Sequence, residues 1–224
     1  MSLKLVVWDL DGTLVDSRAS IFKALQEAAV EVGLAAPSYD EVRQIVGLSL
    51  LEAVRHMRPD LTPDHAQAYA TAYKQVFIRM HAEPDFHEPL YPGAEETLRR
   101  LKAEGWLIGM ATGKSRRGIE RNTVVYGWGD VFDTSFCADD GPSKPHPHML
   151  ECNMTALGVA KNQTIMIGDT THDIHMGREA GVHTIGVSWG FHTVDELEAA
   201  GADVIVHDFD QLNAALDAFV PVTA

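Results

Sequence analysis

The sequence has few cysteines, few cationic side chains and no long apolar run. Its two cysteines, Cys137 and Cys152, lack metal-ligand spacing; we expect reduced thiols, with a disulfide as the open alternative. Lys and Arg number 18 against 32 Asp and Glu, and the net charge of -14 argues against nucleic acid or an anionic membrane as the main partner. No segment is long and apolar enough to span a membrane, and Met1 leads into the first apolar run without a secretory signal. A cytoplasmic location is therefore expected.

The composition is that of an ordinary globular protein. Hydrophobic residues make up 46% of the 224 residues and charged residues 22%, which differs from the composition of a disordered chain. This length suits either one large domain or a core with a smaller inserted domain. Neither an internal repeat nor a low-complexity tract is present.

Helical periodicity extends from residue 16 to about residue 80. The apolar positions at its start recur at intervals of three and four, at Ile21, Leu25, Ala28 and Val32. Three start signals follow, namely capping-box patterns at Ser38-x-x-Glu41 and Ser49-x-x-Glu52 and the pair Thr62-Pro63. We predict three or four helices without a strand, followed by a proline-rich connector over residues 83–93.

Strand and helix patterns alternate in the rest of the chain. A helix is predicted over residues 94–104, and strands are predicted over residues 3–8, 106–111, 134–138, 164–167, 183–187 and 204–206. Such alternation is typical of an α/β fold, in which helices cover both faces of a parallel sheet. The helical block is then an insertion after the first strand.

Two acids follow the first predicted strand, in the run Asp9-Leu-Asp11-Gly-Thr. Side chains two positions apart on a strand share a face, so both carboxylates point into one pocket. Two acids so placed repel each other unless a cation or a proton mediates. One can then remain ionised and attack while the other carries a proton. A polar turn after a strand is the alternative reading of this run alone.

Polar residues also follow the other predicted strands. In parallel sheets, ligands bind beyond the carboxyl ends of the strands, where this chain has Thr112, Gly113, Lys144, Asp169 and Asp173. Carboxylate oxygens from Asp9 and Asp169 suit Mg²⁺, and Asp173 could order the metal or its water shell. Lys144 and Thr112 suit phosphoryl oxygens. Together these groups favour phosphoryl transfer, although each alone could be a helix cap or a solvated charge.

This set of motifs resembles the haloacid dehalogenase-like hydrolase superfamily. The match comprises Asp9-Leu-Asp11-Gly-Thr-Leu-Val, Thr112, Lys144 and Gly168-Asp169-x-x-x-Asp173, in the family's order and over nearly the whole chain. The resemblance implies a three-layer Rossmann-like core formed by residues 1–15 and 89–224, with an α-helical cap over residues 16–88. The chain is most similar to the phosphoglycolate phosphatase branch.

The same resemblance implies the chemistry of the site. Asp9 would be the nucleophile that forms an aspartyl-phosphate, and Asp11 the general acid and base. Thr112, Gly113 and Lys144 would surround the phosphate, while Asp9, the Asp11 backbone carbonyl and Asp169 would hold Mg²⁺. The expected substrate is a small phosphorylated metabolite, such as phosphoglycolate, and neither the substrate nor the oligomeric state follows from the sequence.

Several residues carry additional hypotheses. In the cap, the Gly47-Leu-Ser-Leu segment resembles a loop that contacts substrate, and Arg18 could face a substrate carboxylate; a plain helix corner and a surface arginine are the alternatives. At Gly113, relatives often have Asn or Ser, so a side-chain contact near the phosphate is absent. Lys114 is a second candidate cation, but the family pattern favours Lys144. Four histidines lie near the motifs and are left out of the metal site because Mg²⁺ prefers oxygen ligands, namely His146, His148, His172 and His175.

Other functions were weighed against a phosphatase. A 2-haloacid dehalogenase would not need the proton donor Asp11, and a phosphonatase would need an imine-forming cap lysine, for which Lys23 and Lys74 have no suitable setting. A sugar-phosphate mutase or a pyrophosphatase of the same superfamily remains an alternative. The rival classes are a non-enzymatic phospho-acceptor, which would have no cap insertion, and a degenerate binding module, although no catalytic position is missing.

Overall fold

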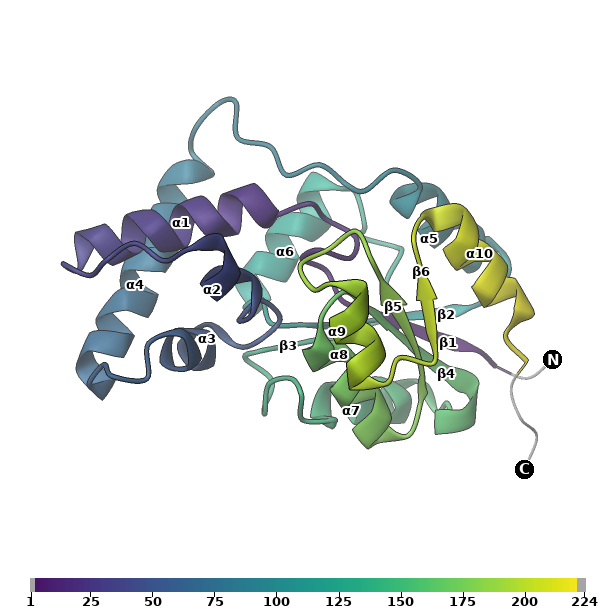
Figure 1. Ribbon diagram of the computed structural model, residues 1–224. Coiled ribbons are helices and arrows are strands. Elements are labelled where there is room, and N and C mark those ends of the chain that lie inside the picture. The colour runs from purple at the N-terminus through teal and green to yellow at the C-terminus, as the bar shows by residue number, and fades with distance from the viewer. Residues whose placement is uncertain (1–2, 221–224) are drawn as a thin grey trace.

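The computed structural model describes residues 3–220 and consists of a parallel sheet, helices on both of its faces, and a helical insertion (Figure 1). The sheet order is β3-β2-β1-β4-β5-β6, and every pairing is parallel. The strands are β1 Leu5–Trp8, β2 Leu107–Thr112, β3 Thr134–Cys137, β4 Thr164–Gly168, β5 His183–Val187 and β6 Val204–Val206. The predicted α/β fold with a parallel sheet is therefore confirmed. Residues 1–2 and 221–224, which the sequence assigned to the core, lie outside the described residues.

Helices cover both faces of the sheet, which makes three layers. One face packs against α5 (Ala94–Ala103), α6 (Arg116–Val125) and α10 (Phe209–Ala218), around strand residues such as Trp8 and Ile167. The other face packs against α7 (His148–Leu157) and α8 (Thr171–Ala180), around Val7 and Met166. Burial of apolar side chains on both faces accounts for the continuous apolar runs of the central strands. A short 3₁₀ helix, η1 (Lys161–Gln163), precedes β4, and α9 (Val194–Ala200) packs against α8.

Four helices lie between β1 and α5 and form a separate group beside the sheet (Figure 1). They are α1 (Arg18–Glu31), α2 (Tyr39–Arg43), α3 (Leu50–Met57) and α4 (Pro63–Met80). Their apolar faces share a core of their own, in which the Tyr69 hydroxyl donates to the Leu25 carbonyl. The two chain segments that enter and leave this helical insertion run side by side, because Val15 pairs with Leu90 and the Asp16 N–H donates to the Pro89 carbonyl.

The helix start signals in the insertion have different outcomes. Ser38 and Glu41 form the predicted capping box, and the Thr62 side chain accepts from the His65 N–H with Pro63 in the first turn. The capping box predicted at Ser49 is wrong, because its side chain accepts no backbone N–H. Its hydroxyl instead donates to the Glu52 carboxylate over 2.6 Å. None of the helices in residues 3–220 is long and apolar enough to cross a membrane.

Candidate active site

The sequence-predicted acids and Lys144 meet at the carboxyl edge of the sheet. Asp9 follows β1, Asp169 follows β4, and Thr112 is the last residue of β2, so the strand order brings three neighbouring strand ends together. Lys144 reaches the same place from the loop between β3 and α7. A parallel sheet orients all of its carboxyl ends to one side, which explains why residues so far apart in sequence converge.

Lys144 joins two of the acids. Its Nζ lies 2.5 Å from Asp9 Oδ1 and 2.6 Å from Asp173 Oδ1, and all three side chains are almost completely buried. Asp173 is held in turn by the capping box at the start of α8, in which its Oδ2 accepts from the Thr170 hydroxyl over 2.7 Å. The second oxygen of Asp9, Oδ2, is buried and has no hydrogen-bond partner. This oxygen is free to bind or to attack a ligand.

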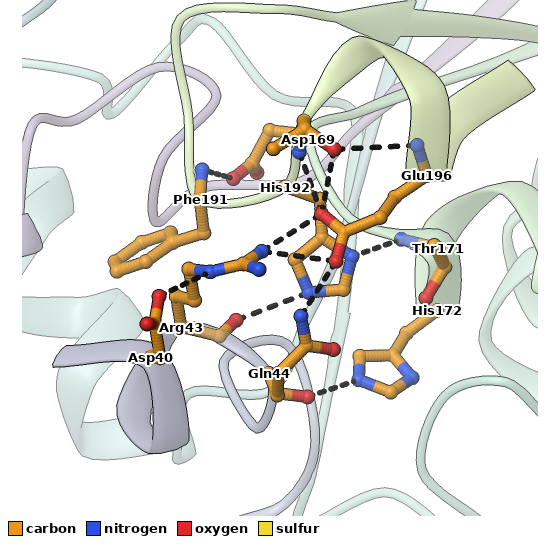
Figure 2. A network of polar contacts seen from close by, with 10 residues as sticks. Asp40, Arg43, Gln44, Asp169, Thr171, His172, Phe191, His192 and Glu196 are labelled. Atoms are coloured by element: carbon orange, nitrogen blue, oxygen red, sulfur yellow. Dashed lines mark hydrogen bonds and ion pairs between the residues drawn. The ribbon is translucent and has the colours of Figure 1, made fainter. Parts of the chain in front are cut away.

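Asp169 is enclosed by the backbone around it. Its Oδ1 accepts from the Thr13 hydroxyl and its Oδ2 from the Phe191 N–H, each over 2.8 Å. The second of these hydrogen bonds is visible in Figure 2. A Cβ atom at Gly12 would lie 2.2 Å from Asp169 Oδ2, and Gly12 also has a φ of 85° that L residues rarely adopt. A glycine at position 12 is therefore required both by the turn and by the carboxylate.

Burial and charge set the protonation of this cluster. Burial is the largest influence on Asp9 and raises its pKa to about 7, although Lys144 opposes the change. Burial, followed by the charges of Asp9 and Asp173, raises the pKa of Asp169 well above its usual range. For Lys144, burial acts to lower the pKa, but the charges of Asp173 and Asp9 outweigh it and raise the pKa. Lys144 thus pairs with two of the three carboxylates, which leaves negative charge to be neutralised by a cation or by protons.

The cluster fits a hard divalent cation. Asp9, Asp169 and Asp173 each offer one oxygen, and these oxygens lie within 4.8 Å of one another. Carboxylate oxygens are preferred ligands of Mg²⁺, so three converging donors of this kind suit the ion. The sequence assigned Asp173 only a supporting position, whereas the structure groups it with Asp9 and Asp169. The carboxylate of Asp11 is not part of this group.

Asp11 is paired with the second candidate lysine. Lys114 Nζ lies 2.8 Å from Asp11 Oδ1. The Lys114 N–H also donates to the Thr112 hydroxyl oxygen over 3.3 Å. Burial acts to lower the pKa of Lys114, but Asp11 and Glu88 raise it, so the side chain is cationic. The family pattern favours Lys144 over Lys114 as the cation of the site. The structure brings both lysines to the site, Lys144 against Asp9 and Lys114 against Asp11.

A cavity of about 730 Å³ opens between the core and the helical insertion. Asp9, Asp11, Thr112 and Gly113 line it from the core, and Gly47 lines it from the insertion. Asp169, Lys144 and Asp173 lie behind this surface, fully buried. Arg18 is not among the lining residues. Its guanidinium is held by Asp16 at 2.8 Å and lies over the Tyr91 ring, so the geometry gives no support to a substrate contact there.

The insertion contacts the core next to this cavity. A Cβ atom at Gly113 would lie 2.5 Å from the Leu48 carbonyl oxygen and 2.7 Å from that of Gly47. The Ser49 N–H also donates to the Ser143 hydroxyl oxygen over 2.7 Å. A side chain at position 113 would therefore collide with the insertion's backbone beside the proposed phosphate site.

A second group of contacts fixes the end of α2 to the core (Figure 2). The Arg43 guanidinium lies 2.7 Å from Glu196 on α9, and the Gln44 amide donates to the same carboxylate over 2.7 Å. His172 and His192 donate through Nε2 to the Gln44 and Arg43 carbonyls, each over 3.0 Å. His172 therefore contacts the insertion.

Sequence reasoning missed His192 and Glu196. Glu196 carries a recognisable signal, because Thr193-x-x-Glu196 is a capping box that the structure confirms. Nothing in that pattern indicates that the same carboxylate also binds Arg43.

Comparison with known proteins agrees with this geometry. The family described as haloacid dehalogenase-like hydrolase matches residues 6–187. A curated protein from Dickeya dadantii named "Probable phosphatase IndB" is 34% identical over 221 residues, with 98% of this chain and 96% of the relative covered. A phosphoglycolate phosphatase from Psychrobacter arcticus is 28% identical, with 95% of each chain covered. The crystal structure of "a predicted phosphatase from Clostridium acetobutylicum" superposes with a TM-score of 0.85 at 25% identity, covering 96% of this chain and 99% of the other.

Proposed function

This chain belongs to the haloacid dehalogenase-like hydrolases and is a hydrolase acting on phosphate esters; we propose that it is a capped, Mg²⁺-dependent phosphatase. Its substrate would be a small phosphomonoester, and the reaction would pass through an aspartyl-phosphate on Asp9. One observation carries the proposal. Asp9 lines the cavity with one buried oxygen that has no partner, while its other oxygen is fixed by Lys144. A carboxylate oxygen that is positioned but not neutralised by a hydrogen bond suits nucleophilic attack.

Asp11 lies beside the nucleophile and is the proposed general acid and base. It lines the same cavity, two residues after Asp9 and directly before the turn at Gly12. Asp11 would protonate the leaving alcohol oxygen while Asp9 Oδ2 attacks phosphorus. The same side chain would then take a proton from the water that breaks the acyl-phosphate.

The remaining polar groups would bind the phosphoryl oxygens and hold the nucleophile. Thr112 is buried at the end of β2 and lines the cavity beside Gly113. Lys144, between Asp9 and Asp173, provides a buried positive charge next to the reacting carboxylate. Preorganised charge of this kind stabilises the transition state because it needs no rearrangement during the reaction.

Asp9, the Asp11 backbone carbonyl and Asp169 would hold Mg²⁺, with Asp173 beside them. When bound, the cation would offset the repulsion between the anionic nucleophile and the anionic substrate. The Thr13 hydroxyl and the Phe191 N–H keep the Asp169 carboxylate in place for this role.

Residues 16–88 are the proposed cap. Support comes from the apolar cluster that these helices form, joined from the core by Phe191, and from the paired chain segments at Val15 and Leu90 where the insertion joins the core. Closure over the cavity would exclude bulk water, and the Gly47 segment would contact the substrate.

The test is multiple turnover of p-nitrophenyl phosphate and of a phosphometabolite panel, with Mg²⁺ and with a chelator. We expect activity only with the metal. Asp9→Asn should abolish turnover and leave the fold intact, and Asp11→Asn should slow dephosphorylation until a phosphorylated chain accumulates, as detected by intact mass. Near-wild-type turnover by Asp9→Asn would refute the assignment. Adding a bisphosphate activator and following isomer formation separates a mutase from this hydrolase.

A further inference from the structure

Lys114 is a cation of the cavity to which the proposed mechanism assigns no role. Its side chain is only 15% exposed, and it lies 2.8 Å from Asp11, the proposed proton donor. Its aliphatic stem packs along Gly118 of α6, where a Cβ atom would lie 3.4 Å from the Lys114 Cβ and Cδ atoms. Position and packing therefore direct this ammonium group towards the leaving-group side of the site rather than towards the Asp9 and Lys144 pair.

Other cations line the same cavity. Arg117 and Arg121 both line it from α6, and because they are four residues apart they lie on the same helix face. Lys74 lines it from α4 in the insertion. Within residues 3–220 none of these three side chains forms an ion pair, in contrast to most arginines of the chain.

The balance of charge in the cavity is opposite to that of the whole chain. Outside the proposed catalytic pair Asp9 and Asp11, the lining contains four cations, Lys74, Lys114, Arg117 and Arg121, but only one acid, Asp139. The chain as a whole has a net charge of -14. A local excess of cations in so acidic a protein favours an anionic ligand group there.

The phosphate that reacts does not account for these cations. It would be bound at the Asp9 end by Thr112 and Gly113, with the charge of Lys144 behind Asp9. Lys114 instead lies on Asp11, beside the oxygen that would leave. A second anion held by Lys114 would therefore be attached to the leaving alcohol, a few bonds from the ester oxygen. The insertion's side of the cavity is largely apolar, with Leu50, Tyr73 and Phe77 among its residues, and would cover the carbon skeleton between the two anions.

We propose that Lys114, supported by Arg117 and Arg121, forms a subsite for a second anionic group on the leaving alcohol, so that the preferred substrates are phosphomonoesters that also carry a carboxylate or another phosphate. The inference rests on the proposed function. Lys114 is a specificity-determining residue in this account. It shares its charge between Asp11 and the substrate anion, and no bond forms or breaks at its nitrogen.

The experiment compares three probes with the same two-carbon leaving group. They are hydroxyethyl phosphate, which has a neutral alcohol, phosphoglycolate, which adds a carboxylate, and ethylene glycol bisphosphate, which adds a phosphate. Wild-type enzyme should hydrolyse at least one anionic probe with a kcat/KM about 10- to 100-fold above that of the neutral probe, the size expected for a charge-assisted contact. The better anionic probe identifies which group the subsite accepts.

Variants show which residues produce the preference for anionic probes. Lys114→Gln and Arg121→Gln should reduce the ratio of anionic to neutral kcat/KM towards one, and Lys114→Arg should retain most of it. The ratio within each variant cancels losses common to all probes, including any effect on Asp11 or on folding. Arg99→Gln removes a cation on α5, outside the cavity, and should leave the ratio unchanged.

The outcomes separate the two proposals. Equal hydrolysis of all three probes by the wild type, or an unchanged ratio in both Lys114→Gln and Arg121→Gln, would overturn the subsite and leave the phosphatase intact. Failure to hydrolyse any phosphomonoester with Mg²⁺ present would instead overturn the proposed function.

Discussion

Gly113 of the core lies against the backbone of the insertion, and Gly113→Ala tests whether this close packing is needed for activity. The added Cβ would lie 2.5 Å from the Leu48 carbonyl oxygen and 2.7 Å from that of Gly47. Gly113 is not among the glycines with a positive φ, so alanine suits its backbone and only the contact changes. Overpacking of this kind raises the free energy of the packed state by about 1–3 kcal/mol.

We expect this penalty to act on closure rather than on folding. The insertion has its own apolar core, so the segment at Gly47 can move away by less than about 1 Å and relieve the contact without unfolding either part. The closed arrangement then becomes less populated, and kcat/KM should fall about 5- to 160-fold, the kinetic equivalent of that penalty. The melting temperature should fall by no more than about 2 °C.

Steady-state kinetics with p-nitrophenyl phosphate and the best substrate of the panel, together with thermal unfolding, provide the assay. Gly129→Ala is the matched control, because a Cβ there meets nothing within 4 Å and its φ is not positive. The reasoning fails if Gly113→Ala keeps wild-type kcat/KM, or if it loses activity only in proportion to lost folded protein. Equal losses in Gly129→Ala would also contradict it.

Two further predictions concern buried and interfacial charge. Lys144→Met leaves the Asp9 and Asp173 carboxylates buried without their cation. Urea unfolding in chelator at pH 7 should therefore show that the free energy of unfolding falls by about 3–5 kcal/mol. A fall under about 1 kcal/mol would argue against the ion pairs. Partial burial acts to raise the pKa of Glu196, but Arg43 and other donors outweigh it and lower the pKa to about 2 from 4.5. Because the pKa of Glu196 is depressed in the folded state, its ion pair stabilises the fold above pH 4.5, and Glu196→Gln should reduce the free energy of unfolding there by about 1 kcal/mol. Denaturation of both proteins across pH should show that the difference in free energy between wild type and variant vanishes towards pH 2.

The strands were predictable because their residues are apolar on both faces, which is the signature of a buried parallel sheet. The predicted strands over residues 183–187 and 204–206 coincide with β5 and β6. The strand predicted over residues 106–111 is displaced by one residue, since β2 continues to Thr112 through its pairing with Cys137. Strand ends depend on the neighbouring strand, and a local pattern does not contain that neighbour.

The capping box at Ser49 failed for a similar reason. Its sequence pattern is the same as at Ser38, where the box forms, but the Ser49 N–H is taken by Ser143 of the core, 94 positions away. The hydroxyl then turns to Glu52 instead of the helix backbone. A local motif predicts a local hydrogen bond only where no tertiary contact competes for the same groups.

Within the site, residue types were predictable from chemistry, but their pairing was not. The sequence indicated acids and a lysine at strand ends, because the carboxyl edge of a parallel sheet gathers them. It gave no means to decide that Lys144 binds Asp9 and Asp173 while Lys114 binds Asp11. The loop after β3 carries Lys144 behind the cavity wall, whereas Lys114, which follows β2, lies at the cavity surface.

One short loop after β5 connects the proposed metal site to the insertion. The Phe191 N–H holds Asp169, and the Phe191 ring packs into the insertion's apolar core. The next residue, His192, donates to the Arg43 carbonyl while its other ring nitrogen accepts from the Thr171 N–H, at the start of α8 (Figure 2). A displacement of the helices α1 to α4 would therefore move the backbone that positions Asp169, the proposed metal ligand. If the insertion closes as proposed, its closure and the assembly of the proposed site are coupled through these two adjacent residues.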